Sequence, residues 1–314
     1  MPRLIAAGLI ALLVPLHSHA TEPAATPPAA QVRIDDVQRF YQLYDRTDGH
    51  PAANRLQSDY LDQGSPGLKQ FVQSRIGSAD KLAAAIDKAP DAYLDARACA
   101  ATLPAVRQQL GDVFSRLAAI HPQAVFPPVT VVIGRNTTGG TTTASGVIIG
   151  LETICRANWM EPDVTARLTH LIAHEYVHLQ QPAARIDPPP GASVLFLSLI
   201  EGGAEFIGEQ ISGQVANIHL QRWTQGHECA IERRFLAEAD GTDVTPWLYN
   251  GPGTPEQPGD LGYWVGYRIA KSYYEQAVDK QQAVAEILAI NNDTAAGFLA
   301  KSGWKPAGGC TALP

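Results

Sequence analysis

The stretch HEYVHLQQ, residues 174–181, carries two histidines four positions apart, with a glutamate directly after the first. On a helix with 3.6 residues per turn, positions i and i+4 lie on the same face, so His174 and His178 can both offer a ring nitrogen to one ion. Glu175 projects about 100° around the helix axis. From there its carboxylate can reach a metal-bound water without being a ligand itself. Short motifs of this kind also arise by chance, so a zinc site requires a third ligand.

The segment VLFLSLIEGGAEFIGEQISG, residues 194–213, contains the best candidate for that ligand. It is apolar nearly all round, which predicts a buried helix, and Ser193 is a suitable N-cap. A buried, unpaired carboxylate is costly, and a metal ion would explain why this helix carries Glu201 and Glu205. We expect Glu201, 23 residues after His178, to be the third ligand. Glu205, one turn further on, would accept the other ring N–H of a liganding histidine. The alternative is that both acids form salt bridges on a half-exposed helix.

Apolar periodicity predicts a mostly helical chain with a small sheet. Residues 34–126 read as an N-terminal helical region, in which Val37, Phe40, Tyr41 and Tyr44 share one stripe. The β-branched runs 129–133 and 147–151 predict two strands joined by a loose Gly- and Thr-rich loop. The histidine helix follows, beginning near Pro162 and ending before Pro182. We assign 127–314 to a catalytic region.

The first twenty residues are typical of a secretory signal. Arg3 precedes the uncharged apolar run 4–16, and small residues, Ser18 and Ala20, end the segment. The alternative, a membrane anchor, would need about 20 apolar residues. We therefore expect cleavage after Ala20, a flexible Pro- and Ala-rich leader over 21–33, export to a periplasmic or secreted location, and no stable insertion into a membrane. The formal net charge of −7 makes nucleic acid an unfavourable partner.

The chain has four cysteines, an even number that suits an oxidising compartment. Three pairings are possible, and sequence neighbourhood favours Cys99 with Cys155 and Cys229 with Cys310. Buried free thiols are the alternative. The spacing lacks any CxxC, so it gives no support to a cysteine zinc finger.

These motifs together resemble a known family. HExxH followed by a glutamate on a second helix resembles the gluzincin metallopeptidases, and several segments resemble the bacterial predicted zinc-dependent proteases that are exported. The segments are YLDQGSPGLKQF (60–71), HEYVHLQQ, IEGGAEF (200–206), WLYNG (247–251), GYWVGYRIAKSYY (262–274) and GFLAKSGW (297–304). The resemblance implies an α+β, mostly helical fold with a thermolysin-like zincin core, and one Zn²⁺ per chain. It implies that His174, His178 and Glu201 hold the zinc, that Glu175 is the general base, and that Glu205 supports a ligand.

The expected reaction is hydrolysis of a peptide bond in a peptide or protein substrate. An oxyanion donor is also needed, and we expect it among Tyr263, Tyr267 and Arg268, which could instead be ordinary core with a snorkelling arginine. By analogy with gluzincins, the strand GVIIGLE (146–152) would pair with an extended substrate. His227 is a weaker candidate for the oxyanion donor, the alternative being an ordinary surface or core histidine, and its HECAI segment lacks a second histidine. We expect His170, one turn before His174, to lie behind the ligands or at the edge of the cleft and not to be a ligand itself.

Two other functions remain open from the sequence. One is a helical binding or scaffold protein with a structural or vestigial zinc site, and the other is a zinc hydrolase of non-peptide amides. The presence of Glu175 favours an enzyme, because a purely structural site has no need of a general base beside its ligands.

Overall fold

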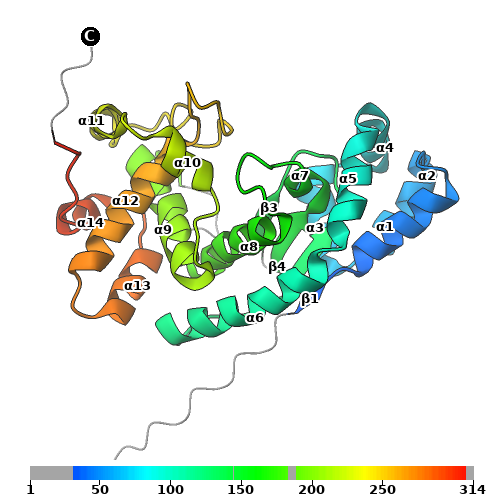
Figure 1. Ribbon diagram of the computed structural model, residues 1–314, viewed down its shortest axis with the longest axis horizontal. Helices are drawn as coiled ribbons and strands as arrows, with labels where there is room; N and C mark the ends of the chain where they lie inside the picture. Colours follow the sequence, from blue (N-terminus) through cyan, green and yellow to red (C-terminus); the bar gives the residue numbers. More distant parts are fainter. Residues whose placement is uncertain (1–30, 144, 183–188, 309–314) are drawn as a thin grey trace, which may run out of the picture.

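The computed structural model describes residues 31–143, 145–182 and 189–308, so the predicted signal segment and most of the predicted leader lie outside the described residues. The fold is α+β and mostly helical, as predicted (Figure 1). Its one described sheet has four short strands in the order β1-β2-β4-β3. Their bounds are β1 Val32–Arg33, β2 Val129–Val132, β3 Gly140–Thr143 and β4 Gly146–Gly150. The first three strands in this spatial order are parallel, and β3 runs antiparallel to β4.

The N-terminal region is helical, as its periodicity predicted. Val37, Phe40, Tyr41 and Tyr44 of the first helix are all buried. The elements of this region are α1 Asp35–Arg46, α2 Ala53–Leu56, η1 Gln57–Leu61, α3 Pro66–Phe71, η2 Val72–Ile76, α4 Ala79–Lys88, α5 Pro90–Ala100 and α6 Leu103–Ile120.

The second half contains the two helices that carry the motif residues, α8 Val164–Gln180 and α9 Val194–Ser212. The side chain of Asp163 caps α8 by accepting a hydrogen bond from the backbone N–H of Ala166. Ser193 caps α9 in the same way through Phe196, so the predicted N-cap is confirmed. The other helices here are α7 Leu151–Cys155, α10 Ile218–Trp223, α11 Glu228–Glu238, α12 Leu261–Gln276, α13 Lys280–Leu288 and α14 Ala295–Lys301.

The region between the two predicted strands differs from the expectation. It is not simply a loose loop, because it contains β3, which pairs along β4 and forms the edge of the sheet. The segment 146–152 is therefore not an edge strand: β4 lies between β2 and β3, and α7 begins at Leu151. The strand expected to be free for a substrate is already paired on both sides, and β3 occupies the edge instead.

The sheet lies between two helical layers. Gly67 of α3 packs against Thr130, whereas Gly140 of β3 packs against Glu175 of α8. In the strand register, Thr130 pairs with Ile148, which in turn pairs with Thr141, so their side chains share one face; Gly140 and Thr142 belong to the other. Helix α8 therefore covers one face, and α3 covers the opposite face. Covering on both faces explains why β2 and β4 are buried along their whole length.

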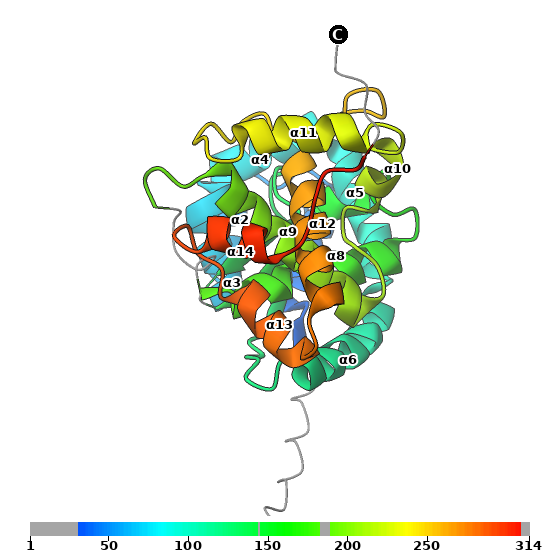
Figure 2. The ribbon, with the colours of Figure 1, turned by 90° about the vertical axis from the view of Figure 1, so that its left-hand side faces the viewer.

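Helices α9 and α12 lie side by side in the second half, with α11 across one end and α13 near the other (Figure 2). Their close approach depends on two glycines. A Cβ atom added to Gly202 would come within 2.1 Å of the backbone of Gly266 and Tyr267, and one added to Gly266 would come within 1.8 Å of the Ser198 carbonyl oxygen. Only residues without a Cβ fit at this crossing.

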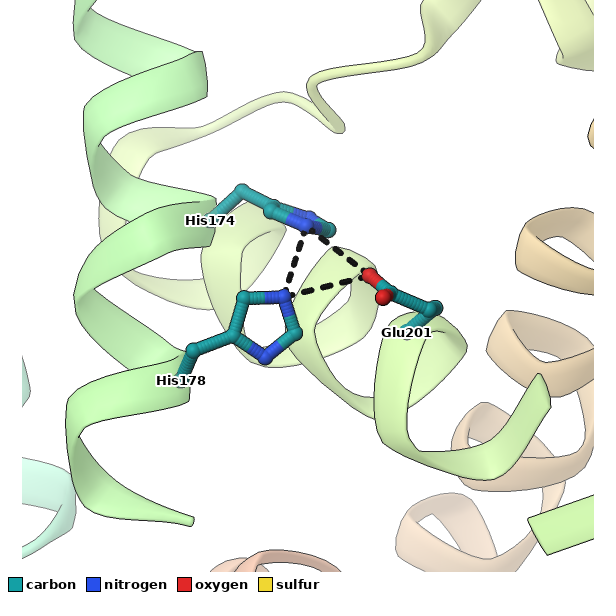
Figure 3. Close-up of side chains that lie close together, drawn as sticks. All are labelled: His174, His178 and Glu201. Carbon is teal, nitrogen blue, oxygen red and sulfur yellow. Dashed lines mark hydrogen bonds and ion pairs between the residues drawn. The ribbon is translucent and has the colours of Figure 1, made fainter. Parts of the chain in front are cut away.

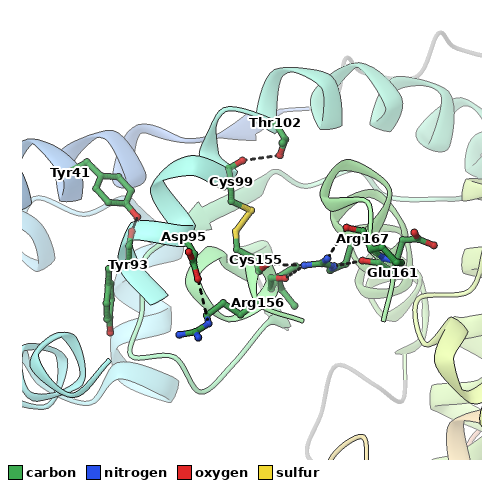
Figure 4. The surroundings of a disulfide bond; sticks show 11 residues. Tyr41, Tyr93, Asp95, Cys99, Thr102, Cys155, Arg156, Glu161 and Arg167 are labelled. Atoms are coloured by element: carbon green, nitrogen blue, oxygen red, sulfur yellow. Dashed lines mark hydrogen bonds and ion pairs between the residues drawn. A yellow bond between two sulfur atoms is a disulfide. The ribbon is translucent and has the colours of Figure 1, made fainter. Parts of the chain in front are cut away.

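A disulfide joins the two halves of the chain. Cys99 of α5 bonds Cys155 at the end of α7, as predicted (Figure 4). Cys310 lies outside the described residues, so the Cys229–Cys310 pairing stays a prediction. Over the described ranges, no helix combines the length and the apolar character needed to cross a membrane.

Candidate metal centre

Helices α8 and α9 bring the three expected ligands to one point (Figure 3). Nε2 of His178 lies 3.1 Å from Nε2 of His174 and 3.1 Å from Oε2 of Glu201. Nε2 of His174 lies 3.4 Å from the same carboxylate oxygen. All three residues are buried, with at most 9% of each exposed.

The spacing of these atoms fits a zinc ion. Nitrogen and oxygen ligands lie about 2.0–2.2 Å from zinc at tetrahedral corners, so neighbouring ligand atoms should be about 3.3 Å apart. The three separations in the site are 3.1, 3.1 and 3.4 Å. The two imidazoles and one carboxylate could therefore hold the ion with little movement and would leave the fourth corner free.

The neighbours of the histidines fix their ring orientations. Nδ1 of His178 lies 2.7 Å from Oε1 of Gln181, and the side-chain N–H of Gln181 donates to the carbonyl of Ile200. If Nδ1 of His178 carries the proton, it donates a hydrogen bond to the amide oxygen of Gln181. Nε2 then keeps its lone pair free for a metal. Gln181 lies within the opening motif, but the sequence does not show that it turns back onto His178.

Glu205 lies on the far side of His174, in the place expected from the sequence. Its Oε1 atom is 3.1 Å from Nδ1 of His174, although the geometry is not that of a hydrogen bond. Asn217 donates two hydrogen bonds to this carboxylate. Its side-chain amide donates to Oε1 at 2.7 Å, and its backbone N–H donates to Oε2 at 3.2 Å. The carboxylate is thus placed to orient His174 electrostatically.

The charges of the cluster depend strongly on one another. Burial lowers the pKa of His174, but the carboxylates of Glu201 and Glu205 outweigh it and raise that pKa to about 10. Burial raises the pKa of Glu201, and the two histidines lower it by more, so it falls well below its ordinary value. Without a metal, a proton on the histidines balances the buried carboxylates, and a divalent cation would take over this role.

Glu175 lies beside the cluster and is not one of its three converging residues. Its side chain is only partly buried, and it faces β3. The hydroxyl of Thr142 lies 3.0 Å from Oε2 of Glu175 and 2.8 Å from its backbone oxygen. These contacts hold Glu175 against β3, outside the set of converging ligand atoms.

Tyr249 is a site residue that the sequence analysis missed as an individual, although WLYNG was noted as a segment. Its hydroxyl donates to Oε1 of Glu201 at 2.9 Å. Tyr249 has a positive φ of 60°. The loop that follows is closed by Asn250 and Asp260, whose backbone N–H groups each donate to the other's side-chain oxygen. Desolvation and the charge of Glu201 raise the pKa of Tyr249, so its phenol stays protonated.

The three residues suggested as oxyanion donors occupy different places. The ring of Tyr263 stacks on His174, with centroids 6.1 Å apart. The hydroxyl of Tyr267 donates to Glu209 at 2.8 Å, and its side chain lines a small cavity with Glu205 and Tyr263. Arg268 bonds Glu232 at 2.5 Å and lies over the ring of Trp264. Only Tyr263 contacts a residue of the metal cluster.

The other two histidines named from the sequence are not among the grouped ligands. Nδ1 of His170 lies 2.9 Å from the hydroxyl of Ser212, and His227 is the N-cap residue of α11.

The comparison with protein families agrees with this geometry. Residues 145–295 match a family described as "Predicted Zn-dependent protease (DUF2268)". The matched range contains both motif helices and Tyr249, so this part of the chain is similar to a family of predicted zinc-dependent proteases. Neither the curated proteins nor the solved structures contain a match to the chain.

Proposed function

We propose that the protein is a zinc-dependent peptidase with the gluzincin arrangement, in which His174, His178 and Glu201 hold one zinc per chain. The observation that carries the proposal is the convergence of three buried ligand atoms within 3.4 Å, with the carboxylate of Glu175 beside them and outside the ligand set. A bound zinc would acidify a water and polarise the carbonyl of the scissile bond.

The remaining chemistry falls to the protein's own groups. Glu175 takes a proton from the attacking water and delivers it to the leaving amine. Glu205 and Gln181 keep the two histidine rings in place. The ring of Tyr263 stacks on His174, so its phenol is the first candidate to donate a hydrogen bond to a developing oxyanion. Tyr249 donates its one hydroxyl hydrogen to Glu201 and would have to release that bond to act in the same way. Tyr267 and Arg268 have other partners, so we assign them no contact with substrate.

We propose that the substrate binds as an extended peptide along β3. In the β3–β4 pair, the N–H of Gly150 donates to the carbonyl of Gly139, so the main-chain groups of Gly139 face β4. In an antiparallel pair this direction repeats at every second residue, so the main-chain groups of Thr141 and Thr143 also face β4. The main-chain groups of Gly140 and Thr142 therefore point away from β4, at the free edge of the sheet. A peptide that adds here as a further strand would lie next to Glu175, and such pairing places few demands on its side chains.

Export is part of the same proposal. It rests on the signal-like segment 1–20 and agrees with the disulfide between Cys99 and Cys155, a bond that persists in oxidising compartments.

The proposal is tested by measuring zinc content and peptide cleavage together. Purified protein should contain about one zinc per chain, and it should cleave members of a peptide library in a reaction that a chelator abolishes. The double variant His174→Ala, His178→Ala should lose both zinc and cleavage. Zinc in equal amount in this variant would overturn the ligand assignment. Bound zinc in the wild type without any cleavage would favour the scaffold alternative.

A further inference from the structure

Helix α8 places Glu175 against strand β3, and two residues of that strand bound its side chain. We propose that Thr142 is a positioning residue, whose hydroxyl holds the Glu175 carboxylate in the orientation needed for proton transfer. This inference rests on the proposed function, because it assigns a role within the same reaction. It also assigns β3 a task beyond any main-chain pairing with substrate.

The geometry restrains Glu175 on two sides. The hydroxyl of Thr142 lies 3.0 Å from Oε2, on one side of the carboxylate, and 2.8 Å from the backbone oxygen of Glu175, so it contacts both the carboxylate and the helix turn that carries it. A Cβ atom added to Gly140 would lie 2.7 Å from Oε1 and 2.9 Å from Cγ, so the side chain fills the space that the glycine leaves. Both residues point to the α8 face of the sheet, because side chains two positions apart share a face.

Such a restraint is useful because the metal does not hold Glu175. A glutamate side chain has three rotatable bonds, and a base must come within hydrogen-bond reach of the proton that it takes. A hydroxyl suits this partner in both of its states. When Glu175 is ionised, the one hydroxyl hydrogen lies between the carboxylate and the backbone oxygen of Glu175, and when Glu175 is protonated the hydroxyl can accept from the carboxylic acid while donating to that backbone oxygen. The contact can therefore persist while Glu175 gains and loses the proton.

The same strand offers its other groups to the substrate. The main-chain groups of Gly140 and Thr142 face the free edge, whereas their side-chain positions face Glu175. A peptide paired along this edge would stiffen the strand that fixes the base. The inference thus links the binding of an extended substrate to the placement of the catalytic carboxylate.

The test compares three variants with a matched control in the same strand. Thr142→Val removes the hydroxyl and keeps the shape, Thr142→Ser restores a hydroxyl, and Gly140→Ala pushes on the carboxylate. Thr141→Val makes the same chemical change on the opposite face, where the Thr141 hydroxyl instead accepts from Arg75 at 3.3 Å. Zinc content is measured for every variant and should match that of the wild type.

We expect Thr142→Val and Gly140→Ala to lower kcat by roughly 10- to 100-fold, because a catalytic group misplaced by about 1 Å costs rate on this scale. KM should change by less than about 3-fold, because a base acts in the transition state and does not bind the ground state. Thr142→Ser should keep most of the wild-type kcat, and Thr141→Val should behave like the wild type.

Three kinetic results would overturn the inference: an unchanged kcat in Thr142→Val, a loss in Thr142→Ser as large as in Thr142→Val, or a rise in KM alone. A wild-type protein that binds zinc and cleaves no peptide would instead defeat the proposed function.

Crystal structures of the variants then test the positioning role. We expect the Glu175 carboxylate to move by about 1 Å or more in Thr142→Val and to stay in place in Thr141→Val, and an unmoved carboxylate in both would refute it.

Discussion

Glu201 is a member of the buried cluster and Glu175 lies beside it, and their different neighbours suit the different roles that we propose for them. Glu201 is buried and touches both histidines and Tyr249. Glu175 is partly exposed and contacts β3 through Thr142. Removing the charge should therefore affect the metal in one case and only the chemistry in the other.

Glu175→Gln should keep the zinc and the melting temperature of the wild type while losing roughly 10²-fold or more in activity, the usual weight of a general base. Glu201→Gln should lose activity as well, but it should also lose zinc and melt earlier, because a ligand is replaced by a weaker one in a buried site. Elemental analysis, thermal melts and peptide cleavage measure the three properties. Cleavage by Glu175→Gln at the wild-type rate would show that Glu175 is not the base.

Asp260 supplies a prediction about pH. Burial raises its pKa from an ordinary 3.8 to about 6, and the charge of Glu201 adds to the shift. The folded protein therefore binds this proton more tightly than the unfolded chain does. The stabilisation from Asp260 is fully present below about pH 4, falls between about pH 4 and 6, and is absent above.

Asp260→Asn stays neutral at every pH and keeps the side-chain oxygen that accepts from the backbone N–H of Asn250. In metal-free protein, its free energy of unfolding relative to the wild type should rise by about 1 kcal/mol between pH 4 and pH 8. The full shift would correspond to 2–3 kcal/mol at about 1.4 kcal/mol per pKa unit, and partial exposure reduces it. Urea unfolding at the two pH values measures the difference. An equal difference at both would show that the pKa is not raised.

At the scale of elements, the contact between α9 and α12 depends on the absence of two side chains. A Cβ at Gly266 would overlap the carbonyl oxygen of Ser198, and backbone atoms cannot move aside as the end of a side chain can. Helix α9 carries Glu201 directly before Gly202, so this crossing also fixes the position of a proposed metal ligand.

Gly266→Ala should lower the free energy of unfolding by about 2 kcal/mol or more, because the overlap outweighs the gain in helix propensity. The matched control is Gly111→Ala in α6, an exposed position with no atom within 4 Å of the added Cβ. That change should raise stability by about 0.5–1 kcal/mol. Urea unfolding of both variants checks the signs, and a stabilised Gly266→Ala would contradict the close packing.

The elements that the sequence predicted correctly are those with local signals. Helices α8 and α9 both begin at a residue whose side chain caps the helix, and α8 also carries two histidines at i and i+4. Each of these signals is visible within about 20 residues of sequence. Strand β3 was missed because Gly140–Thr143 has no alternation of apolar and polar residues. Tyr249 and Glu201 are separated by 48 residues in the sequence, and their contact depends on how a loop folds back. No local sequence pattern predicts it.

At the scale of the whole molecule, the sheet and the disulfide tie the N-terminal helices to the half that carries the site. Strand β1 pairs with β2 across a sequence gap that contains all of α1 to α6. Cys99 and Cys155 join α5 to α7, and α7 is followed along the chain by α8, the helix that carries His174 and His178. The two regions named from the sequence therefore share one sheet and one covalent link.

The double variant Cys99→Ala, Cys155→Ala should lose about 4 kcal/mol of unfolding free energy, because the bond closes a long loop with a sequence separation of 56. Its zinc content should stay at the wild-type level, since neither cysteine is among the grouped ligands. Urea unfolding under oxidising conditions and elemental analysis measure both. An unchanged urea midpoint would show that the bond does not constrain the unfolded chain.

In an exported chain the cysteines would reach the oxidising compartment in the order of the sequence, and this order suits the bond. Cys99 and Cys155 are neighbours in the series of four, so the partner of Cys99 is the next cysteine to be synthesised. Cys229 and Cys310 are added only later, when the first pair has already emerged. Exchange between wrongly paired cysteines takes seconds to hours, and a chain whose first two cysteines belong together can form this bridge at their first encounter, without a reshuffling step.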